Sequence, residues 1–193
     1  MSGELEKFTA KLCLSKGLDP SDGNEELKRI MTERFLKNDF QMVSGVQKLV
    51  RHLGESGVPM AIATNMKADQ FRGGMGRVVG FDFKNFSHYV CGGDDPEVED
   101  NKPAPDVYLV CAKRFRPEPI SLDRCVVFED SIRGITGAIG SGMKTVLISD
   151  EKSSQFDAIR DQITVVVNSF DEFRPESVGL PPYPDPDQLK KLA

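Results

Sequence analysis

Short apolar runs alternate with segments of helical period through most of the chain. The apolar runs lie at residues 59–63, 125–128, 145–148 and 164–167, with a shorter one near 88–91. Continuous apolar runs of this length are typical of strands buried on both faces, as in a parallel sheet. Because segments of helical spacing separate them, the pattern predicts an α/β fold with a mainly parallel sheet.

Local signals mark the ends of several of the intervening helices. One helix begins near Val46 and ends at Gly54 or Gly57, because glycine is common just past a helix end. Another opens at 102–106, where proline is tolerated in the first turn. A third comes after Ser131, a residue type that caps helix starts. The sequence therefore predicts helices that connect successive strands.

The first 41 residues have a different pattern. Apolar positions recur at helical spacing over 4–16 and 24–36, and the turn 19–23 separates the two segments. Two helices bury little surface alone, so we expect them to pack against the remainder of the chain. The predicted organisation is a helical appendage at 1–41 and an α/β core at 42–193.

Composition and charge narrow the class of protein. The chain has 193 residues, a formal net charge of −5 and 28% charged residues. An acidic balance argues against a nucleic-acid partner and against a basic membrane-binding patch. No apolar run approaches the ~20 residues that span a bilayer, and the start shows no signal-peptide pattern. The four cysteines are scattered without metal-type spacing, so we expect reduced thiols in a cytoplasmic protein.

Two acids come directly after the apolar run 125–128. Glu129 and Asp130 would fall at the carboxyl ends of the strands, where open α/β sheets bind ligands. Adjacent carboxylates repel each other unless a cation lies between them, and Mg²⁺ prefers such oxygen ligands. The simpler alternative is a loop in which both acids face solvent.

Thr64 ends another predicted strand, and Lys102 lies where a loop leads into a predicted helix. The Thr64 hydroxyl could bind a phosphate oxygen, and the Lys102 ammonium could neutralise a phosphoryl group. Taken alone, a threonine here is more often a helix cap and a lysine a solvated surface charge. Together with the acid pair they predict a site for phosphoryl chemistry.

Three segments resemble motifs II, III and IV of the haloacid dehalogenase-like (HAD) phosphatases. They are Ile62-Ala63-Thr64-Asn65, Lys102-Pro103-Ala104-Pro105-Asp106 and Val127-Phe128-Glu129-Asp130-Ser131. The resemblance covers most of 42–183, and within the superfamily it is closest to the pseudouridine-5′-phosphatases. It implies a Rossmannoid three-layer core around a parallel sheet, with residues 1–41 as part of a helical cap.

The same resemblance implies a role for each matched residue. Thr64 would bind the phosphate, Asn65 would help to hold the substrate, and Lys102 would stabilise the charge of the phosphoryl group. Glu129 and Asp130 would hold Mg²⁺. The implied function is hydrolysis of a small phosphorylated metabolite, for which a nucleotide-like compound is one candidate.

One motif of that family has no counterpart upstream of Thr64. The family's reaction begins at an Asp-x-Asp on the tip of the first, central strand, whose first aspartate attacks phosphorus. The one Asp-x-Asp here, at 185–187, lies in a proline-rich tail, and neither His52 nor His88 is placed to substitute. We therefore expect a truncated phosphatase with little or no turnover. The alternative is a non-catalytic relative that binds phosphate, Mg²⁺ or a partner protein.

The absent central strand also predicts a structural consequence. In the family it lies between the strand that ends at Thr64 and the strand at 125–128. Without it, both strands have an edge of unpaired N–H and C=O groups, which invites pairing with another chain. We expect either that these two strands pair directly, or that the polypeptide is marginally stable and self-associates through its exposed edges.

Overall fold

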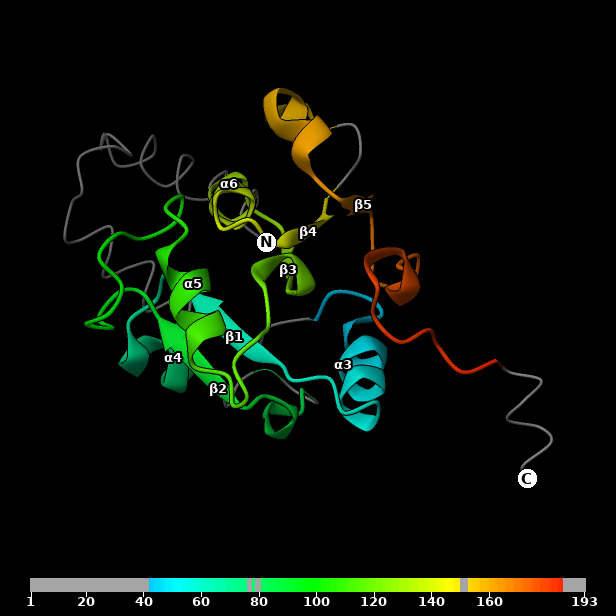
Figure 1. The fold of residues 1–193 in the computed structure, drawn as a ribbon, viewed down its shortest axis with the longest axis horizontal. Coiled ribbons are helices and arrows are strands. Elements are labelled where there is room, and N and C mark those ends of the chain that lie inside the picture. The colour runs from blue at the N-terminus through cyan, green and yellow to red at the C-terminus, as the bar shows by residue number, and fades with distance from the viewer. Residues whose placement is uncertain (1–41, 76–77, 79–80, 150–152, 186–193) are drawn as a thin grey trace, which may run out of the picture.

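The computed structural model describes residues 42–75, 78, 81–149 and 153–185 (Figure 1). Its helices and strands are α3 (Val46–Glu55), β1 (Ala61–Thr64), α4 (Ala68–Met75), β2 (His88–Cys91), α5 (Asp106–Lys113), β3 (Val126–Glu129), α6 (Ile132–Gly140), β4 (Lys144–Ile148) and β5 (Val165–Val167). Short 3₁₀ segments lie at Phe83–Asn85, Leu122–Arg124, Ser154–Gln162 and Pro175–Val178. The helices and the partial cap predicted within 1–41 lie outside the described residues.

The predicted order of strands and helices after residue 42 is confirmed, because its local signals are strong. Ser131 caps α6, and its Oγ accepts the backbone N–H of Gly134 at 3.0 Å. Helix α5 begins directly after Pro105, as its prolines indicate. The sequence did not reveal α4, whose second half carries two adjacent glycines. Glycine is a poor helix former, so tertiary contacts decide such a segment.

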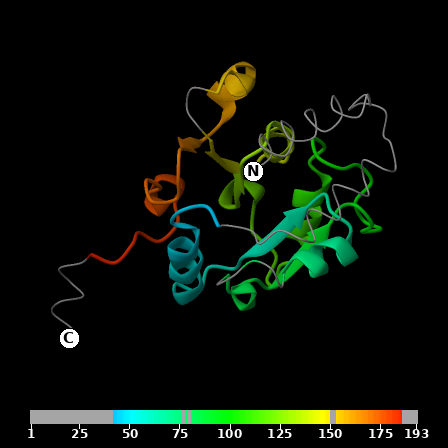
Figure 2. The same cartoon turned by 180° about the vertical axis from the view of Figure 1, so that it is seen from behind.

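The strands form two separate parallel sheets. β1 pairs with β2, and β3, β4 and β5 pair in that order. Figures 1 and 2 show the two groups apart from both sides. Within the described residues no strand lies between β1 and β3, and the two do not pair with each other. The expected direct pairing of these strands is therefore wrong, whereas self-association stays a prediction.

Helices cover both faces of the strands. On one face, α3 packs in a cluster with residues of β4 and β5, and with the partly buried Val126 and Phe128. On the other face, α5 and α6 pack in a cluster with the partly buried Ala61, Ala63 and Val127. Successive side chains of a strand point to opposite faces, which explains why β3 contributes to both clusters. This arrangement gives the layered α/β core that the sequence predicts.

Burial differs sharply between the strands. All residues of β1 and β3 are only half-buried, although their apolar sequences predict burial on both faces. In the middle strand β4, by contrast, Thr145, Val146 and Leu147 are at most 1% exposed. The difference arises because β4 has a paired neighbour on each side and β1 and β3 have one each.

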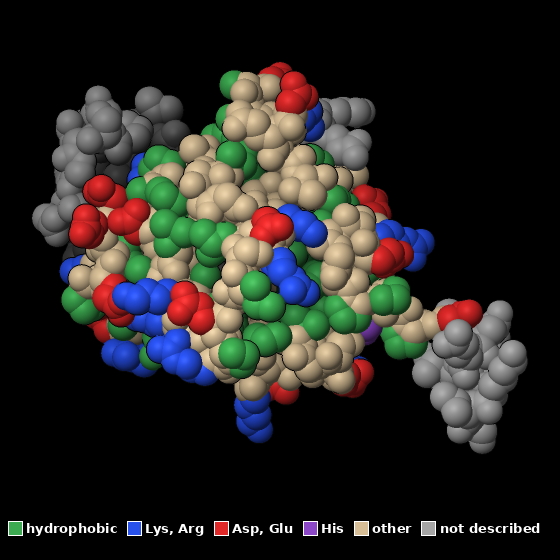
Figure 3. Space-filling model, viewed as in Figure 1, with side chains coloured by type: hydrophobic (Ala, Val, Ile, Leu, Met, Phe, Trp, Pro, Cys, Tyr) green, Lys and Arg blue, Asp and Glu red, His purple; other side chains and the backbone are tan. Residues whose placement is uncertain are grey.

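The surface carries charges of both signs. Figure 3 shows acidic and basic side chains interspersed with hydrophobic ones over one face, without a single large basic area. No helix of the described residues is both long and apolar enough to cross a bilayer.

Candidate functional site

Lys102 connects the two sheets at the carboxyl ends of their strands. Its Nζ donates to the carbonyl oxygen of Ala63 in β1 at 2.9 Å and to Oε1 of Glu129 in β3 at 2.5 Å. The Lys102 and Glu129 side chains are each only 10% exposed. Burying an unpaired charge costs a large free energy, so each of these two buried charges depends on the other for compensation. Lys102 is therefore not a solvated surface charge.

The Glu129 carboxylate contacts two hydroxyl groups and packs against a glycine. The Tyr108 hydroxyl lies 2.6 Å from Oε1, and the Ser131 hydroxyl donates to Oε2 at 3.3 Å. Burial, and then the negative charge of Glu129, raise the pKa of Tyr108, so its hydroxyl stays protonated and able to donate. A Cβ atom at Gly134 would lie 2.0 Å from Glu129 Oε2. Glycine is thus required there to leave room for the carboxylate.

The backbone of Lys102 is fixed from two directions. The Asn65 side chain donates to the Lys102 carbonyl at 3.3 Å and accepts the Lys102 N–H at 3.1 Å. Arg133 Nε in α6 donates to the same carbonyl at 2.9 Å. Asn65 is therefore a positioning residue for the loop that carries Lys102. Its expected contact with a substrate stays a prediction.

Thr64 and Asp130 lie at the ends of the same two strands. The Thr64 Oγ1 accepts the backbone N–H of Met66 at 3.2 Å, which leaves its hydroxyl hydrogen to be donated to a ligand. Asp130 comes directly after β3 and is exposed. The structure thus brings Lys102 and Glu129 into contact. Thr64 directly follows Ala63, whose carbonyl accepts from Lys102, and Asp130 directly follows Glu129.

The two acids match Mg²⁺ in the chemistry of their donors. Mg²⁺ in proteins is usually bound by one or two carboxylates, with waters and phosphate oxygens as further ligands. Among the described residues there is no group of three or more His, Cys, Asp or Glu that could hold a metal. Glu129 and Asp130 are adjacent in the chain at the end of β3 and supply two carboxylates. Both oxygens of Glu129 already have protein contacts: Oε1 contacts Lys102 and Tyr108, and Oε2 accepts the Ser131 hydroxyl at 3.3 Å.

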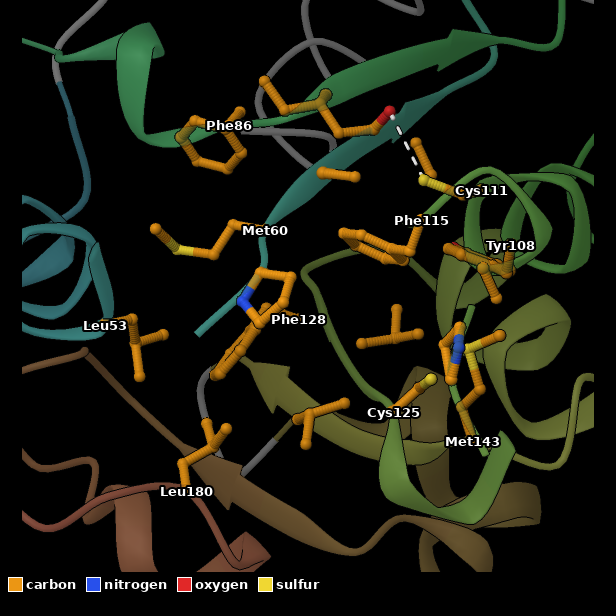
Figure 4. A pocket seen from close by; sticks show the side chains of 18 of the residues that line it. Leu53, Met60, Phe86, Tyr108, Cys111, Phe115, Cys125, Phe128, Met143 and Leu180 are labelled. Atoms are coloured by element: carbon orange, nitrogen blue, oxygen red, sulfur yellow. Dashed lines mark hydrogen bonds between the residues drawn. The ribbon is translucent and has the colours of Figure 1, made fainter. Parts of the chain in front are cut away.

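A cavity of about 710 Å³ lies between β1 and β3 (Figure 4). Residues of α3, including Leu53, and residues of α5, including Cys111, contribute to its walls, and Phe128 projects from β3. Burial raises the pKa of the Cys111 thiol to about 12, so this thiol stays neutral and behaves as an apolar group. Glu129 also lines the cavity, so the cavity extends to the contact between Glu129 and Lys102.

Sequence reasoning missed the residues that support this pair. Tyr108 occupies a helical position that a pattern assigns simply to the core. Arg133 lies in the first turn of α6, where a basic residue gives no special signal. Gly134 was the one available hint, because a glycine inside a helix weakens it and needs another reason.

Known proteins are similar to this chain in sequence and in fold. The family model described as haloacid dehalogenase-like hydrolase matches residues 8–148. A probable pseudouridine-5′-phosphatase of Drosophila melanogaster is 39% identical over 160 residues, which cover 82% of this chain and 66% of that protein. The (DL)-glycerol-3-phosphatase 2 of Arabidopsis thaliana is 30% identical over 186 residues, which cover 92% of this chain and 72% of that protein.

A solved structure supports the same fold. The HAD family hydrolase of Deinococcus radiodurans R1, with bound phosphate and sodium, superimposes with a TM-score of 0.65 at 22% identity. The match covers 92% of this chain and 77% of that one. The aligned part of this chain spans just under two thirds of the Drosophila protein, so the relatives contain regions that this chain does not match.

Proposed function

The chain belongs to the haloacid dehalogenase-like hydrolases, and on that basis we propose that its site binds the phosphoryl group of a small phosphorylated metabolite beside Mg²⁺. The matched Drosophila and Arabidopsis proteins are named as phosphatases of different small compounds. They support a phosphomonoester as the ligand class. The higher identity to the pseudouridine-5′-phosphatase favours a nucleotide-like ester.

The contact between Lys102 and the ends of both sheets is the observation that carries this proposal. It fixes a buried cation at the carboxyl edge of the strands, where α/β proteins bind their ligands. An ammonium has three N–H donors, and two of them are donated to Ala63 and Glu129. The third, together with the Thr64 hydroxyl, would bind phosphoryl oxygens.

Glu129 and Asp130 would hold the magnesium ion. When bound, Mg²⁺ would neutralise negative charge on the phosphoryl group. The residues of this chain would do the rest: Tyr108 and Ser131 orient the Glu129 carboxylate, and Lys102 limits the negative charge at the site.

We propose in addition that residues 1–193 alone hydrolyse phosphate esters slowly or not at all. Hydrolysis through a phosphorylated carboxylate needs an aspartate or glutamate aimed at phosphorus. Glu129 is held by Lys102 and Tyr108, and Asp130 is assigned to the metal. The Asp-x-Asp in the sequence begins at Asp185, far along the chain from β3. The second candidate function, binding of phosphate or Mg²⁺ without catalysis, rests on the absence of such an attacking group among the residues that the structure describes.

Binding of each ligand can be tested without turnover. We expect Mg²⁺ and inorganic phosphate each to bind in calorimetric titration, and phosphate to bind more tightly when Mg²⁺ is present. Asp130→Asn should weaken Mg²⁺ binding about tenfold or more, and Glu99→Gln, which changes another exposed acid, should not. The proposed site is wrong if neither ligand binds, or if the two variants behave alike.

Turnover is tested on an aryl phosphate and on pseudouridine 5′-phosphate, with Mg²⁺ and with a chelator. We expect rates at the background of a Lys102→Ala preparation. Chelator-sensitive turnover that Lys102→Ala abolishes would instead show that another carboxylate acts as the nucleophile. That result would refute the proposed inactivity and leave the binding site intact.

A further inference from the structure

The Thr64 loop (residues 64–67) connects β1 to α4 and takes its position from a second loop at 92–98. Helix α4 gives it little support, because a helix with two adjacent glycines is weak. In the second loop, Gly92 donates its N–H to the Thr64 carbonyl at 2.7 Å. The Asp94 side chain accepts the N–H of the first residue of α4 at 2.9 Å. Both ends of the Thr64 loop are therefore attached to the 92–98 loop.

The two loops also touch backbone to backbone at Gly93. Its N–H donates to the Met66 carbonyl at 3.2 Å. A Cβ atom at Gly93 would lie 2.8 Å from the backbone nitrogen of Lys67 and 2.9 Å from the backbone oxygen of Asn65. Closely packed groups of this kind have no free space between them, so strain in one is transmitted to the other. A displacement of the 92–98 loop would therefore displace the Thr64 loop.

Arg114, directly after the last residue of α5, holds the 92–98 loop. Its Nη1 and Nη2 donate to the two carboxylate oxygens of Asp95 at 2.6 and 2.8 Å, which is the bidentate arrangement of a strong ion pair. Its Nη2 also donates to Glu97 at 2.6 Å. The Arg114 and Asp95 side chains are 30% and 12% exposed, so solvent screens this pair only in part. The 92–98 loop is thus fastened to the end of a core helix.

We propose that Arg114 and Asp95 are positioning residues, which hold the Thr64 hydroxyl where it donates to a phosphoryl oxygen. They act through the 92–98 loop and do not contact the ligand themselves. This inference rests on the proposed role of Thr64 in binding phosphate. Because a bidentate pair allows few side-chain arrangements, it orders both loops before the ligand arrives. The free energy of ordering them is then not subtracted from the affinity for phosphate.

Amide hydrogen exchange tests whether Arg114 holds the Thr64 loop. The matched control for Arg114→Met is Lys113→Met, which removes the same charge from the preceding residue and breaks an exposed contact with Glu97. In Arg114→Met the amides that join the two loops should exchange about fivefold faster. These are the amides of Gly92, Gly93 and Ala68. The amide of Lys144, in the other sheet, should exchange at an unchanged rate, and Lys113→Met should accelerate none of the four.

Ligand binding tests whether this support matters at the site. In calorimetric titration, inorganic phosphate should bind Arg114→Met about fivefold more weakly than the unaltered chain, and it should bind Lys113→Met as tightly. Mg²⁺ alone should bind all three proteins equally, because Tyr108 and Ser131 orient Glu129 without either loop. A general loss of stability would instead weaken the binding of both ligands. The difference between phosphate and Mg²⁺ therefore separates positioning from a merely structural role.

A second variant, Asp95→Asn, carries the same test if Arg114→Met does not fold. It keeps the side-chain shape and should show both effects in the same direction, and the double variant should bind phosphate no more weakly than Arg114→Met. The proposal is overturned if Arg114→Met binds phosphate as tightly as the unaltered chain, if phosphate and Mg²⁺ binding weaken equally, or if the Lys144 amide accelerates as much as the loop amides. If the unaltered chain binds no phosphate, the proposed function fails, and the exchange rates alone decide whether Arg114 holds the Thr64 loop.

Discussion

Replacing Lys102 by methionine tests whether the buried ion pair holds the site together. The substitution keeps most of the side-chain volume and removes the positive charge, so the Glu129 carboxylate, which is 10% exposed, loses its cationic partner. Breaking a buried pair by removing one partner costs about 3–5 kcal/mol. The Tyr108 and Ser131 hydroxyls still contact the carboxylate, so we expect the lower end, about 3 kcal/mol.

That loss would be large relative to the whole free energy of unfolding. Domains of this kind are stable by about 5–15 kcal/mol, so a substantial fraction of Lys102→Met would unfold in mild urea. The double variant Lys102→Met/Glu129→Gln removes both charges and should recover much of the loss. Its recovery separates the cost of an unpaired charge from the cost of altered packing.

The assay is urea unfolding monitored by far-ultraviolet circular dichroism, because the chain contains no tryptophan. Lys113→Met is the matched control, since Lys113 pairs with Glu97 at 2.9 Å with the two side chains 66% and 42% exposed. An exposed pair contributes roughly 0–1 kcal/mol. Equal, small losses in Lys102→Met and Lys113→Met would refute the view that the Lys102 pair is buried and stabilising.

Further predictions concern a glycine and an acid. Gly134→Ala should lower the free energy of unfolding by about 1–3 kcal/mol in the same assay, because the new Cβ would displace the Glu129 carboxylate. Gly140→Ala is the control and should not lower it, because no atom outside the helix lies within 3.8 Å of the new Cβ. A stabilised Gly134→Ala would contradict this packing. A hydrogen bond from Arg114 lowers the pKa of Asp95. The ionised Asp95 therefore stabilises the folded chain fully above about pH 4, and this contribution is lost as the pH falls through the lowered pKa. Unfolding measured from neutral to acid pH should thus show a weaker pH dependence in Asp95→Asn, and identical profiles would refute it.

The sequence alone determined the order of strands and helices and the chemistry at the strand ends. The apolar runs at 125–128 and 145–148 and the cap at Ser131 act within a few residues, so their patterns predict β3, β4 and the start of α6. Chain direction then fixed Glu129 at the carboxyl end of β3. These features depend on local periodicity and on the direction of the chain, which a sequence displays directly.

Only the tertiary structure decided what these residues contact. The sequence left two alternatives, direct pairing of the strand ending at Thr64 with the strand at 125–128 or self-association, because the pairing of strands depends on helices that lie far away in the chain. In the structure α3 and α5 line the space between them, and a cavity stays open. Likewise no periodicity shows that Lys102 donates to both Ala63 and Glu129, because that contact joins residues up to 39 positions apart. Side-chain partners of this kind are set by packing between elements, which the sequence of a single segment does not determine.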